Sequence, residues 1–259
     1  MFSARQRRRV PTLLSVLVGL RLISGVPYAV APSVLHKRSE PLLLTPYIRA
    51  NQAGTARRLA LIKDLPGASP VLNDLIRSYS GYVTVNEACQ SNIFFWFFPK
   101  PIEQAKGGGT QAPLRPNVPA SPSNNAISNN DGANSSVERP SGGDLLNKTA
   151  PLLLWMQGGP GASSLFGLFV ETGPFQVNMD LTLSLRKSSW LQHASLLYVD
   201  NPVGSGFSYT MDDACYPGNQ RAIGDDLVEF VRQFYLLFPE LVSTPFYVGG
   251  QSYAGEIPS

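Results

Sequence analysis

A chain of 259 residues, 43% of them hydrophobic, is long enough to form one α/β domain with a buried core. Its formal net charge is +3, but the first 29 residues hold five arginines and no acidic residue. Since +3 less these five charges is −2, composition gives no support for nucleic-acid binding.

Residues 1–31 have the layout of a secretory signal peptide. Basic residues between positions 5 and 9 precede an apolar stretch over residues 10–20, and Arg21 interrupts that stretch before it is long enough for a typical membrane-spanning helix. Residues 29–31 offer an A-x-A cleavage site, although the proline that follows disfavours cleavage there. The alternative is an uncleaved anchor or amphipathic tail. We expect a secreted or a lysosomal or vacuolar protein without a stable membrane span.

The next segments change from mixed to strand-like composition. Residues 32–77 mix charged and apolar residues, and we expect a leader segment that adds no core, with a short helix near Ala53 to Lys63. A partial α/β domain is expected over residues 78–259. Tyr82 to Val85 and Ile93 to Phe98 are rich in β-branched and aromatic residues and predict a β-hairpin made of core strands.

Residues 104–148 predict a low-complexity insertion in this domain. They contain three successive glycines, five prolines and paired asparagines, with too few large apolar residues to bury a core, so we expect disorder. Because the insertion lies between two predicted strands, it is interpreted as a surface loop; a binding loop that folds on a partner is the alternative. Its sequons at Asn134 and Asn147 are compatible with glycosylation, or are chance matches in Asn/Ser-rich sequence.

The remaining elements alternate between strand and helix, which is the α/β order. We expect a buried strand at Pro151–Met156, a short apolar helix at Ser163–Phe169, a buried strand at Ser195–Asp200, a helix at Gln220–Phe238 and a strand at Phe246–Val248. The last helix has apolar residues at helical spacing that predict a core-facing stripe. These are Ile223, Leu227, Phe230, Val231, Phe234, Leu237 and Phe238.

Two motifs carry the chemistry. Residues 250–255 (GQSYAG) follow the last strand and place Ser252 among small residues, as a nucleophile elbow requires because its strand-to-helix turn is tight. Residues 155–164 (WMQGGPGASS) follow another strand, and their glycine turn can direct a backbone N–H at a developing oxyanion. Each motif alone is weak evidence, since the second is also compatible with a plain tight turn.

With four further motifs, the chain resembles the serine carboxypeptidase family of α/β-hydrolases, which remove C-terminal residues from peptides. The other motifs are SGYVTV (80–85), NIFFWFF (92–98), VETGP (170–174) and DNPVGSGFSYT (200–210), all in the family's order. The stretch LLLTPYIRA (42–50) and Gln157 are most similar to the vitellogenic-like carboxypeptidase branch. The resemblance implies an incomplete α/β-hydrolase fold, the N-terminal part of the sheet up to the nucleophile elbow.

The resemblance also implies roles for particular residues. Ser252 would be the nucleophile, and the backbone N–H groups of Gly159 and Tyr253 would form the oxyanion hole. The free carboxylate of a peptide or protein substrate would be bound by Gln157, Gly158, Glu171 and Gln251. Gln157 replaces the commoner asparagine and keeps the amide. Gln251 replaces a usual glutamate, so half of a proton-sharing acid pair is lost; alternatively, Gln251 merely fills an elbow position.

The base for Ser252 is not found in this sequence. In α/β-hydrolases the acid and the histidine follow the serine, and no histidine follows Ser252. His36 lies in the leader and His193 precedes a buried strand, where we expect a structural or surface role. We therefore expect a serine-type carboxypeptidase truncated before its Asp and His. The alternatives are a non-catalytic carboxypeptidase-like protein and, disfavoured by Glu171, an acyltransferase or esterase.

The two cysteines and the remaining motifs complete the sequence predictions. Cys89 and Cys215 are expected either to pair with each other or to pair with cysteines in sequence not present here. By resemblance, residues 200–209 form a wall of the substrate cleft; their G-S-G lacks the third glycine of a dinucleotide site. No Cys/His cluster has metal-ligand spacing, and no cofactor is expected.

Overall fold

The computed structural model describes residues 40–102 and 146–256. The signal peptide expected over residues 1–31 lies outside the described residues, as does nearly all of the insertion expected over residues 104–148. The described residues other than Ile102 belong to one compact unit. No helix within the described ranges is long and apolar enough to cross a membrane.

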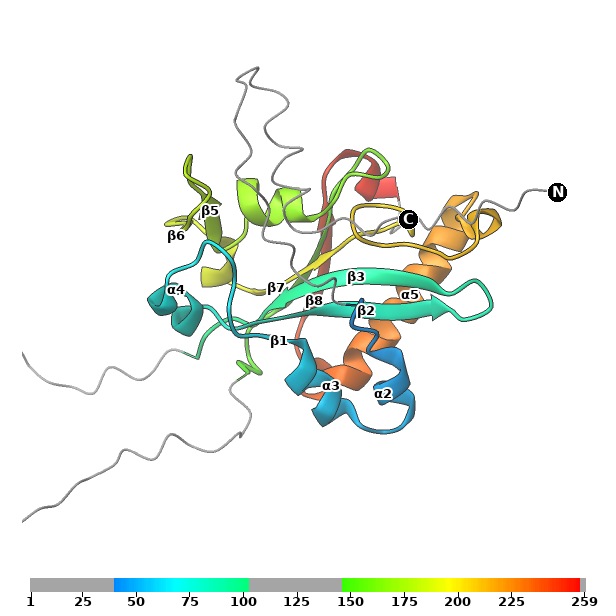
Figure 1. Ribbon diagram of the computed structural model, residues 1–259, viewed down its shortest axis with the longest axis horizontal. Coiled ribbons are helices and arrows are strands. Elements are labelled where there is room, and N and C mark those ends of the chain that lie inside the picture. The colour runs from blue at the N-terminus through cyan, green and yellow to red at the C-terminus, as the bar shows by residue number, and fades with distance from the viewer. Residues whose placement is uncertain (1–39, 103–145, 257–259) are drawn as a thin grey trace, which may run out of the picture. The chain divides into compact units, whose positions relative to one another are not determined.

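A six-stranded mixed sheet in the order β1-β2-β3-β7-β4-β8 forms the centre of this unit (Figure 1). Strands β1, β2, β3 and β7 pair antiparallel in succession, whereas β7, β4 and β8 are parallel to one another. The strands span Leu61–Ile62 (β1), Ser78–Asn86 (β2), Ser91–Phe98 (β3), Leu152–Met156 (β4), Ser195–Val199 (β7) and Phe246–Gly250 (β8). A separate two-stranded sheet joins Phe175–Val177 (β5) to Leu183–Leu185 (β6). The predicted hairpin and the three later strands are confirmed.

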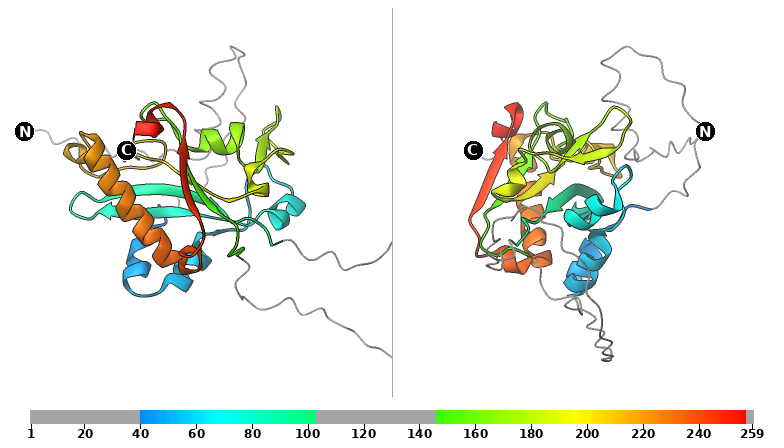
Figure 2. Two further views of the ribbon diagram at one scale, coloured as in Figure 1. Left: turned by 180° about the vertical axis from the view of Figure 1, so that it is seen from behind. Right: turned by 90° about the vertical axis from the view of Figure 1, so that its left-hand side faces the viewer.

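Helices cover both faces of the large sheet (Figure 1, Figure 2). The α-helices span Thr45–Arg49 (α2), Ala53–Ala60 (α3), Pro70–Leu75 (α4) and Gln220–Leu237 (α5). The shorter helical segments span Gly167–Glu171 (η1), Trp190–Gln192 (η2), Asp213–Cys215 (η3), Pro239–Leu241 (η4) and Ser252–Glu256 (η5). Helices α2, α3 and α5 pack on one face, while α4 and η1 lie on the other.

Alternation along the strands divides the core between these two faces. In β3, Phe95 and Phe97 point to the side of α5, and Phe94, Trp96 and Phe98 point to the other side. This is the two-residue period of a pleated strand. All eight residues of β3 are buried, as the run IFFWFF predicts for a strand with both faces covered.

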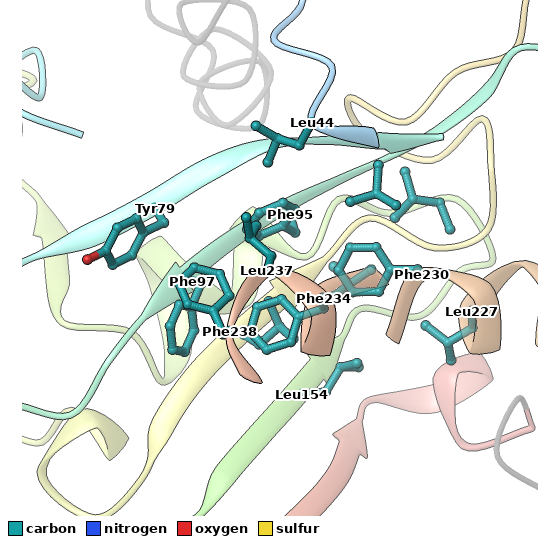
Figure 3. Close-up of a cluster of buried hydrophobic side chains, with 14 of the residues drawn as sticks. Leu44, Tyr79, Phe95, Phe97, Leu154, Leu227, Phe230, Phe234, Leu237 and Phe238 are labelled. Atoms are coloured by element: carbon teal, nitrogen blue, oxygen red, sulfur yellow. The ribbon is translucent and has the colours of Figure 1, made fainter. Parts of the chain in front are cut away.

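The first core cluster is built around the aromatic stripe of α5 (Figure 3). Phe234 contacts the rings of Phe95 and Phe97 on the sheet with centroid distances of 6.0 and 5.2 Å. Asn219 caps the helix, because its side chain accepts a hydrogen bond from the Ala222 N–H at 2.9 Å. The predicted helix and its core-facing stripe are confirmed, with Val231 only partly buried.

The expectation that residues 32–77 add no core is wrong for the described part of that segment. Leu44 and Ala56 are fully buried in the first cluster, and Thr45 Oγ1 donates a hydrogen bond to Oε1 of Gln233 on α5 at 2.7 Å. The predicted helix also ends earlier, at Ala60. The next two residues turn extended and pair with β2, so sheet pairing replaces the last helical turn.

One glycine in α5 offers a test of the helix itself. A methyl group at Gly224 would meet no neighbouring atom within 4 Å, and its φ lies outside the left-handed region. Gly224→Ala should therefore stabilise the protein by about 0.5–1 kcal/mol, since alanine loses less backbone freedom on folding. Urea denaturation should show a higher midpoint at unchanged slope. A lower midpoint would show that this helix face packs against something that the space around Gly224 does not reveal.

A disulfide joins the turn between β2 and β3 to the segment ahead of α5. Cys89 and Cys215 are bonded, which settles their pairing in favour of each other. The Thr210 hydroxyl donates a hydrogen bond to the Cys89 carbonyl at 2.9 Å beside the bridge. The two segments are 126 residues apart in sequence, so the bridge links the hairpin to the second half of the domain.

Strand β8 forms an edge of the described sheet and pairs only with β4 there. Three of its large apolar side chains are exposed, at 37% for Phe246, 59% for Tyr247 and 41% for Val248. The apolar run forms a strand, as predicted. The described residues do not cover its large side chains.

Candidate active site

The carboxyl ends of the parallel strands β4, β7 and β8 meet at one edge of the sheet, where α/β proteins place their ligands. Gln157 follows β4, Asp200 follows β7, and Gln251 and Ser252 follow β8. The sequence motifs around these residues are far apart in the chain, and the strand order brings them side by side (Figure 2).

Ser252 occupies a sharp turn between β8 and η5. Its φ is +56°, in the left-handed region that only a few non-glycine residues adopt, as at nucleophile elbows. A methyl group at Gly250 would lie 2.5 Å from Ala254 Cβ and 2.9 Å from the Met156 carbonyl oxygen, so the turn has no room for a larger residue. Ser252 itself is exposed. This is the backbone shape that the GQSYAG motif predicts.

The glycine turn after β4 lies directly against this elbow. A methyl group at Gly158 would lie 2.5 Å from the Gln251 carbonyl oxygen, 2.9 Å from Ser252 Cβ and 3.1 Å from the Tyr253 nitrogen. Only a residue without a side chain fits so close to the backbone of the neighbouring turn. The two motifs that sequence analysis paired are therefore in contact. Gly159, the next residue, is exposed and has a φ of +123°.

Side-chain amides connect the two turns. The Trp155 ring N–H donates to Gln157 Oε1 at 3.1 Å, and Gln157 Nε2 donates to Gln251 Oε1 at 2.5 Å. Gln157 is 6% exposed, whereas Gln251 is exposed. The hydrogen bond occupies the Gln251 side-chain oxygen and leaves the two N–H donors of its exposed amide for other partners. Trp155 is a member of this network that sequence reasoning did not single out.

Glu171 lies at the end of η1, the helical segment whose first residue, Gly167, packs against Trp155 and Gln157. A methyl group at Gly167, one turn earlier, would overlap the Trp155 ring nitrogen and lie 3.2 Å from Gln157 Oε1. Glu171 Oε2 is buried and has no hydrogen-bond partner among the described residues, and Glu171 makes no hydrogen bond to Gln157 or Gln251 there. A buried carboxylate oxygen without a partner is costly, and a ligand donor would relieve that cost.

The helix predicted over Ser163–Phe169 is present, but it starts two residues later and continues as a π-helix to Glu171. Helical structure begins at Leu165, and η1 is a π-helix with its closing hydrogen bond from Thr172 N–H to Gly167 O at 2.8 Å. The two serines that should have started the helix instead bind Asp200. The Ser163 hydroxyl and the Ser164 N–H donate to its carboxylate at 2.9 and 2.7 Å.

Asp200 anchors the glycine turn to the loop after β7. Its carboxylate also accepts from the Phe207 N–H at 2.8 Å, and a methyl group at Gly206 would overlap it. Ser164 continues the link, since its hydroxyl accepts from the Gln157 N–H at 3.0 Å and donates to the Val199 carbonyl. The segment expected to form a cleft wall thus surrounds a buried carboxylate. Sequence motifs do not predict this contact, because the two residues are some 37 positions apart in the chain.

Burial raises the pKa of Asp200 to about 6, against the opposing effect of hydrogen bonds from Phe207, Ser164 and Ser163. The folded state therefore holds this proton more tightly than the unfolded chain, where an aspartate has a pKa of about 3.9. The resulting stability is fully present below about pH 4 and is lost as the pH rises through 6, at a cost of up to about 3 kcal/mol.

We therefore expect the melting temperature of the wild-type chain to fall between pH 4 and 7 more steeply than that of Asp200→Asn, which cannot titrate. Thermal denaturation monitored by circular dichroism across this range checks the difference. Asp64→Asn, at an exposed position, is the matched control and should keep the wild-type slope. Parallel curves for wild type and Asp200→Asn would show that Asp200 stays in one protonation state.

His193 is exposed and lies just before β7, at the end of the strand opposite to Asp200. It has no place near Ser252, because β7 runs parallel to β4 and β8. His193 therefore lies at the surface, which is compatible with the expected structural or surface role. No described group of three or more His, Cys, Asp or Glu side chains is arranged to hold a metal ion.

Comparison with known proteins agrees with this geometry. The serine carboxypeptidase family model matches residues 142–258. A probable serine carboxypeptidase CPVL of Pongo abelii is 39% identical over 217 residues, covering 84% of this chain and 35% of the relative. The vitellogenic carboxypeptidase of Aedes aegypti is 36% identical, with 84% and 36% covered, and a venom serine carboxypeptidase of Apis mellifera is 38% identical, with 83% and 36% covered.

A solved structure was also found, that of Kex1(delta)p, a prohormone-processing carboxypeptidase from Saccharomyces cerevisiae. It aligns with a TM-score of 0.49 at 26% identity, covering 71% of this chain and 32% of that one.

A mixed sheet with a serine elbow at the end of a parallel strand defines an α/β-hydrolase, as predicted. The chain belongs to the serine carboxypeptidase family, with relatives named CPVL and vitellogenic carboxypeptidase. It spans about a third of the length of the curated relatives that it matches.

Proposed function

We propose that this chain carries the nucleophile and the carboxylate-binding site of a serine-type carboxypeptidase. The observation that carries the proposal is the contact between two motifs. Ser252 stands exposed at a left-handed turn, and the Gly158 backbone is packed against it with no room for a methyl group. A plain tight turn would need no such approach to a serine.

In the proposed reaction, Ser252 Oγ attacks the carbonyl carbon of the last peptide bond. The carbonyl oxygen becomes an oxyanion, which the N–H groups of Gly159 and Tyr253 stabilise. The peptide nitrogen leaves with a proton, and water then hydrolyses the acyl-enzyme. A base must accept the Ser252 proton. We place the Asp and His of the triad in the part of the family's length that this chain does not span.

The substrate carboxylate is proposed to bind beside the two linked glutamines. The exposed Gln251 amide offers donors, the Gly158 N–H lies at the turn, and the buried Gln157 fixes the Gln251 orientation. Glu171, with one buried oxygen lacking a partner, is proposed to line the same carboxylate site. The partner is thus a peptide or protein with a free C-terminus. A secreted or lysosomal location fits the Cys89–Cys215 disulfide.

Two other functions share this scaffold. A non-catalytic carboxypeptidase-like protein would bind peptides through the same groups without turnover. An esterase or acyltransferase would use Ser252 but would have no need for a carboxylate site, and the amide network at Gln157 and Gln251 favours carboxylate recognition.

Binding of a blocked dipeptide to the chain tests the carboxylate site without requiring turnover. We expect the free acid to bind more tightly than its amide. Because the Gln251 amide does not titrate, affinity for the acid should persist over a broader pH range in wild type than in Gln251→Glu. In that variant two acids would share a proton, so affinity should fall by about tenfold per pH unit above the pKa of the pair.

Isothermal titration calorimetry from pH 4 to 8 measures both differences, with Ser252→Ala as a variant expected to bind like wild type. Equal binding of acid and amide would refute carboxylate recognition and favour the esterase. If wild type and Gln251→Glu lost affinity at the same pH, Gln251 would not belong to the recognition site.

A further inference from the structure

A short turn just before β4 holds the partly exposed side-chain amide of Asn147. Asn147 Oδ1 accepts three hydrogen bonds, from the Thr149 hydroxyl at 2.8 Å, the Thr149 N–H at 3.0 Å and the Ala150 N–H at 3.1 Å. Three donors on one atom fix the orientation of the amide, so its Nδ2 end points away from the turn. Nδ2 makes one long contact, 3.5 Å to the Pro101 carbonyl oxygen.

This turn is held in place on both sides. Leu146 is 3% exposed and belongs to the main core cluster, and Ala150 is 5% exposed, whereas Lys148 and Thr149 between them are exposed. The three hydrogen bonds to Oδ1 all lie within residues 147–150, so the turn can form as the chain is made, before distant segments meet. Residues 147–149 read Asn-Lys-Thr, an acceptor sequence for N-linked glycans.

We propose that Asn147 is an N-glycosylation site, which takes an oligosaccharide on its side-chain nitrogen. The donor class is an oligosaccharide carried on a lipid diphosphate. Nδ2 forms a bond to C1 of the first sugar, the bond from C1 to the diphosphate oxygen breaks, and the amide gives up one proton as the lipid diphosphate leaves. The third position of the acceptor sequence requires a hydroxyl, and here the Thr149 hydroxyl donates a hydrogen bond to Asn147 Oδ1. We infer that Thr149 promotes the transfer through this bond.

A glycan at this position leaves the proposed active site open. Asn147 precedes β4, while Gln157 follows it, and the five residues of that strand span about 16 Å. The parallel strands place Ser252 at the same far end as Gln157. The inference therefore stands independently of the peptidase proposal, and neither result decides the other.

The test uses the full chain behind a strong secretion signal in a glycosylating host, so that entry into the secretory pathway does not depend on residues 1–31. Asn134→Gln removes the other sequon. Enzymatic removal of N-glycans in heavy-oxygen water, followed by peptide mass spectrometry, should label position 147. Thr149→Ser keeps the hydroxyl and should keep the label, while the isosteric Thr149→Val should lose it.

The isotope label is measured on the peptide after digestion. The measurement therefore works even for a variant that folds poorly and is retained in the cell. The Cys89–Cys215 disulfide, detected in the same digest, reports that the chain entered an oxidising compartment. An unlabelled Asn147 in disulfide-bonded chain, or a label that survives in Thr149→Val, would overturn the proposal.

Discussion

The 259-residue chain should hydrolyse a blocked dipeptide no faster than its Ser252→Ala variant. An elbow and an oxyanion hole without a base leave only weak residual catalysis, about 10⁴- to 10⁶-fold below an intact triad. His193 is the one histidine among the described residues, and it lies at the opposite end of the parallel strands from Ser252. Hydrolysis followed by mass spectrometry over days measures the difference.

A His193→Ala variant serves as the control for this expectation, since it removes a base that the fold keeps away from the site. It should match wild type in residual rate and in folding. Ser252-dependent turnover at ordinary enzyme rates would contradict the reasoning. If that turnover also disappeared in His193→Ala, the assignment of His193 to the surface would have to be abandoned.

Phe234→Ala should destabilise the fold by about 3–5 kcal/mol, a large part of the 5–15 kcal/mol that typical domains possess. Phe234 is 1% exposed and contacts rings on β3 and on its own helix, so truncation leaves a cavity that its neighbours cannot fill (Figure 3). Val228→Ala, at a position 70% exposed on the same helix, should change stability by less than about 0.5 kcal/mol.

Urea denaturation of both variants beside wild type gives the two values. Similar small effects for Phe234→Ala and Val228→Ala would mean that the packing of α5 on the sheet contributes little. If Phe234→Ala is too unstable to purify, its soluble yield is compared with that of Val228→Ala expressed in the same host. A much lower yield for Phe234→Ala would then support the expected destabilisation.

Patterns that depend on neighbouring residues were predictable. The alternation in β3 and the helical spacing in α5 arise within a few residues, and both elements have the predicted type. The elbow was likewise predictable, because small residues around Ser252 are needed for a local turn. The contact of Gly158 with this elbow followed from the family resemblance, which brings two distant motifs to one site.

Features that depend on distant partners were not predictable from local patterns. Ser163 and Ser164 donate hydrogen bonds to a carboxylate 36 or 37 residues later in the chain. Nothing in the residues next to them indicates this contact, so the predicted helix started too early. The burial of Leu44 depends on the sheet and α5 lying over it, and its neighbours in the sequence do not show this distant packing. Trp155 was not predicted as part of the site, because its role is a hydrogen bond from the ring nitrogen to the Gln157 side chain, which no sequence pattern indicates.

The outer side of β8 has a consequence for how this chain behaves in a crowded solution. Its backbone pairs on one side only within the described sheet, and Phe246, Tyr247 and Val248 are exposed. Such an edge is a template for strand addition by any other chain. Self-association through it is second order in concentration, so a tenfold dilution lengthens its half-time about tenfold and leaves that of folding, a first-order event, unchanged.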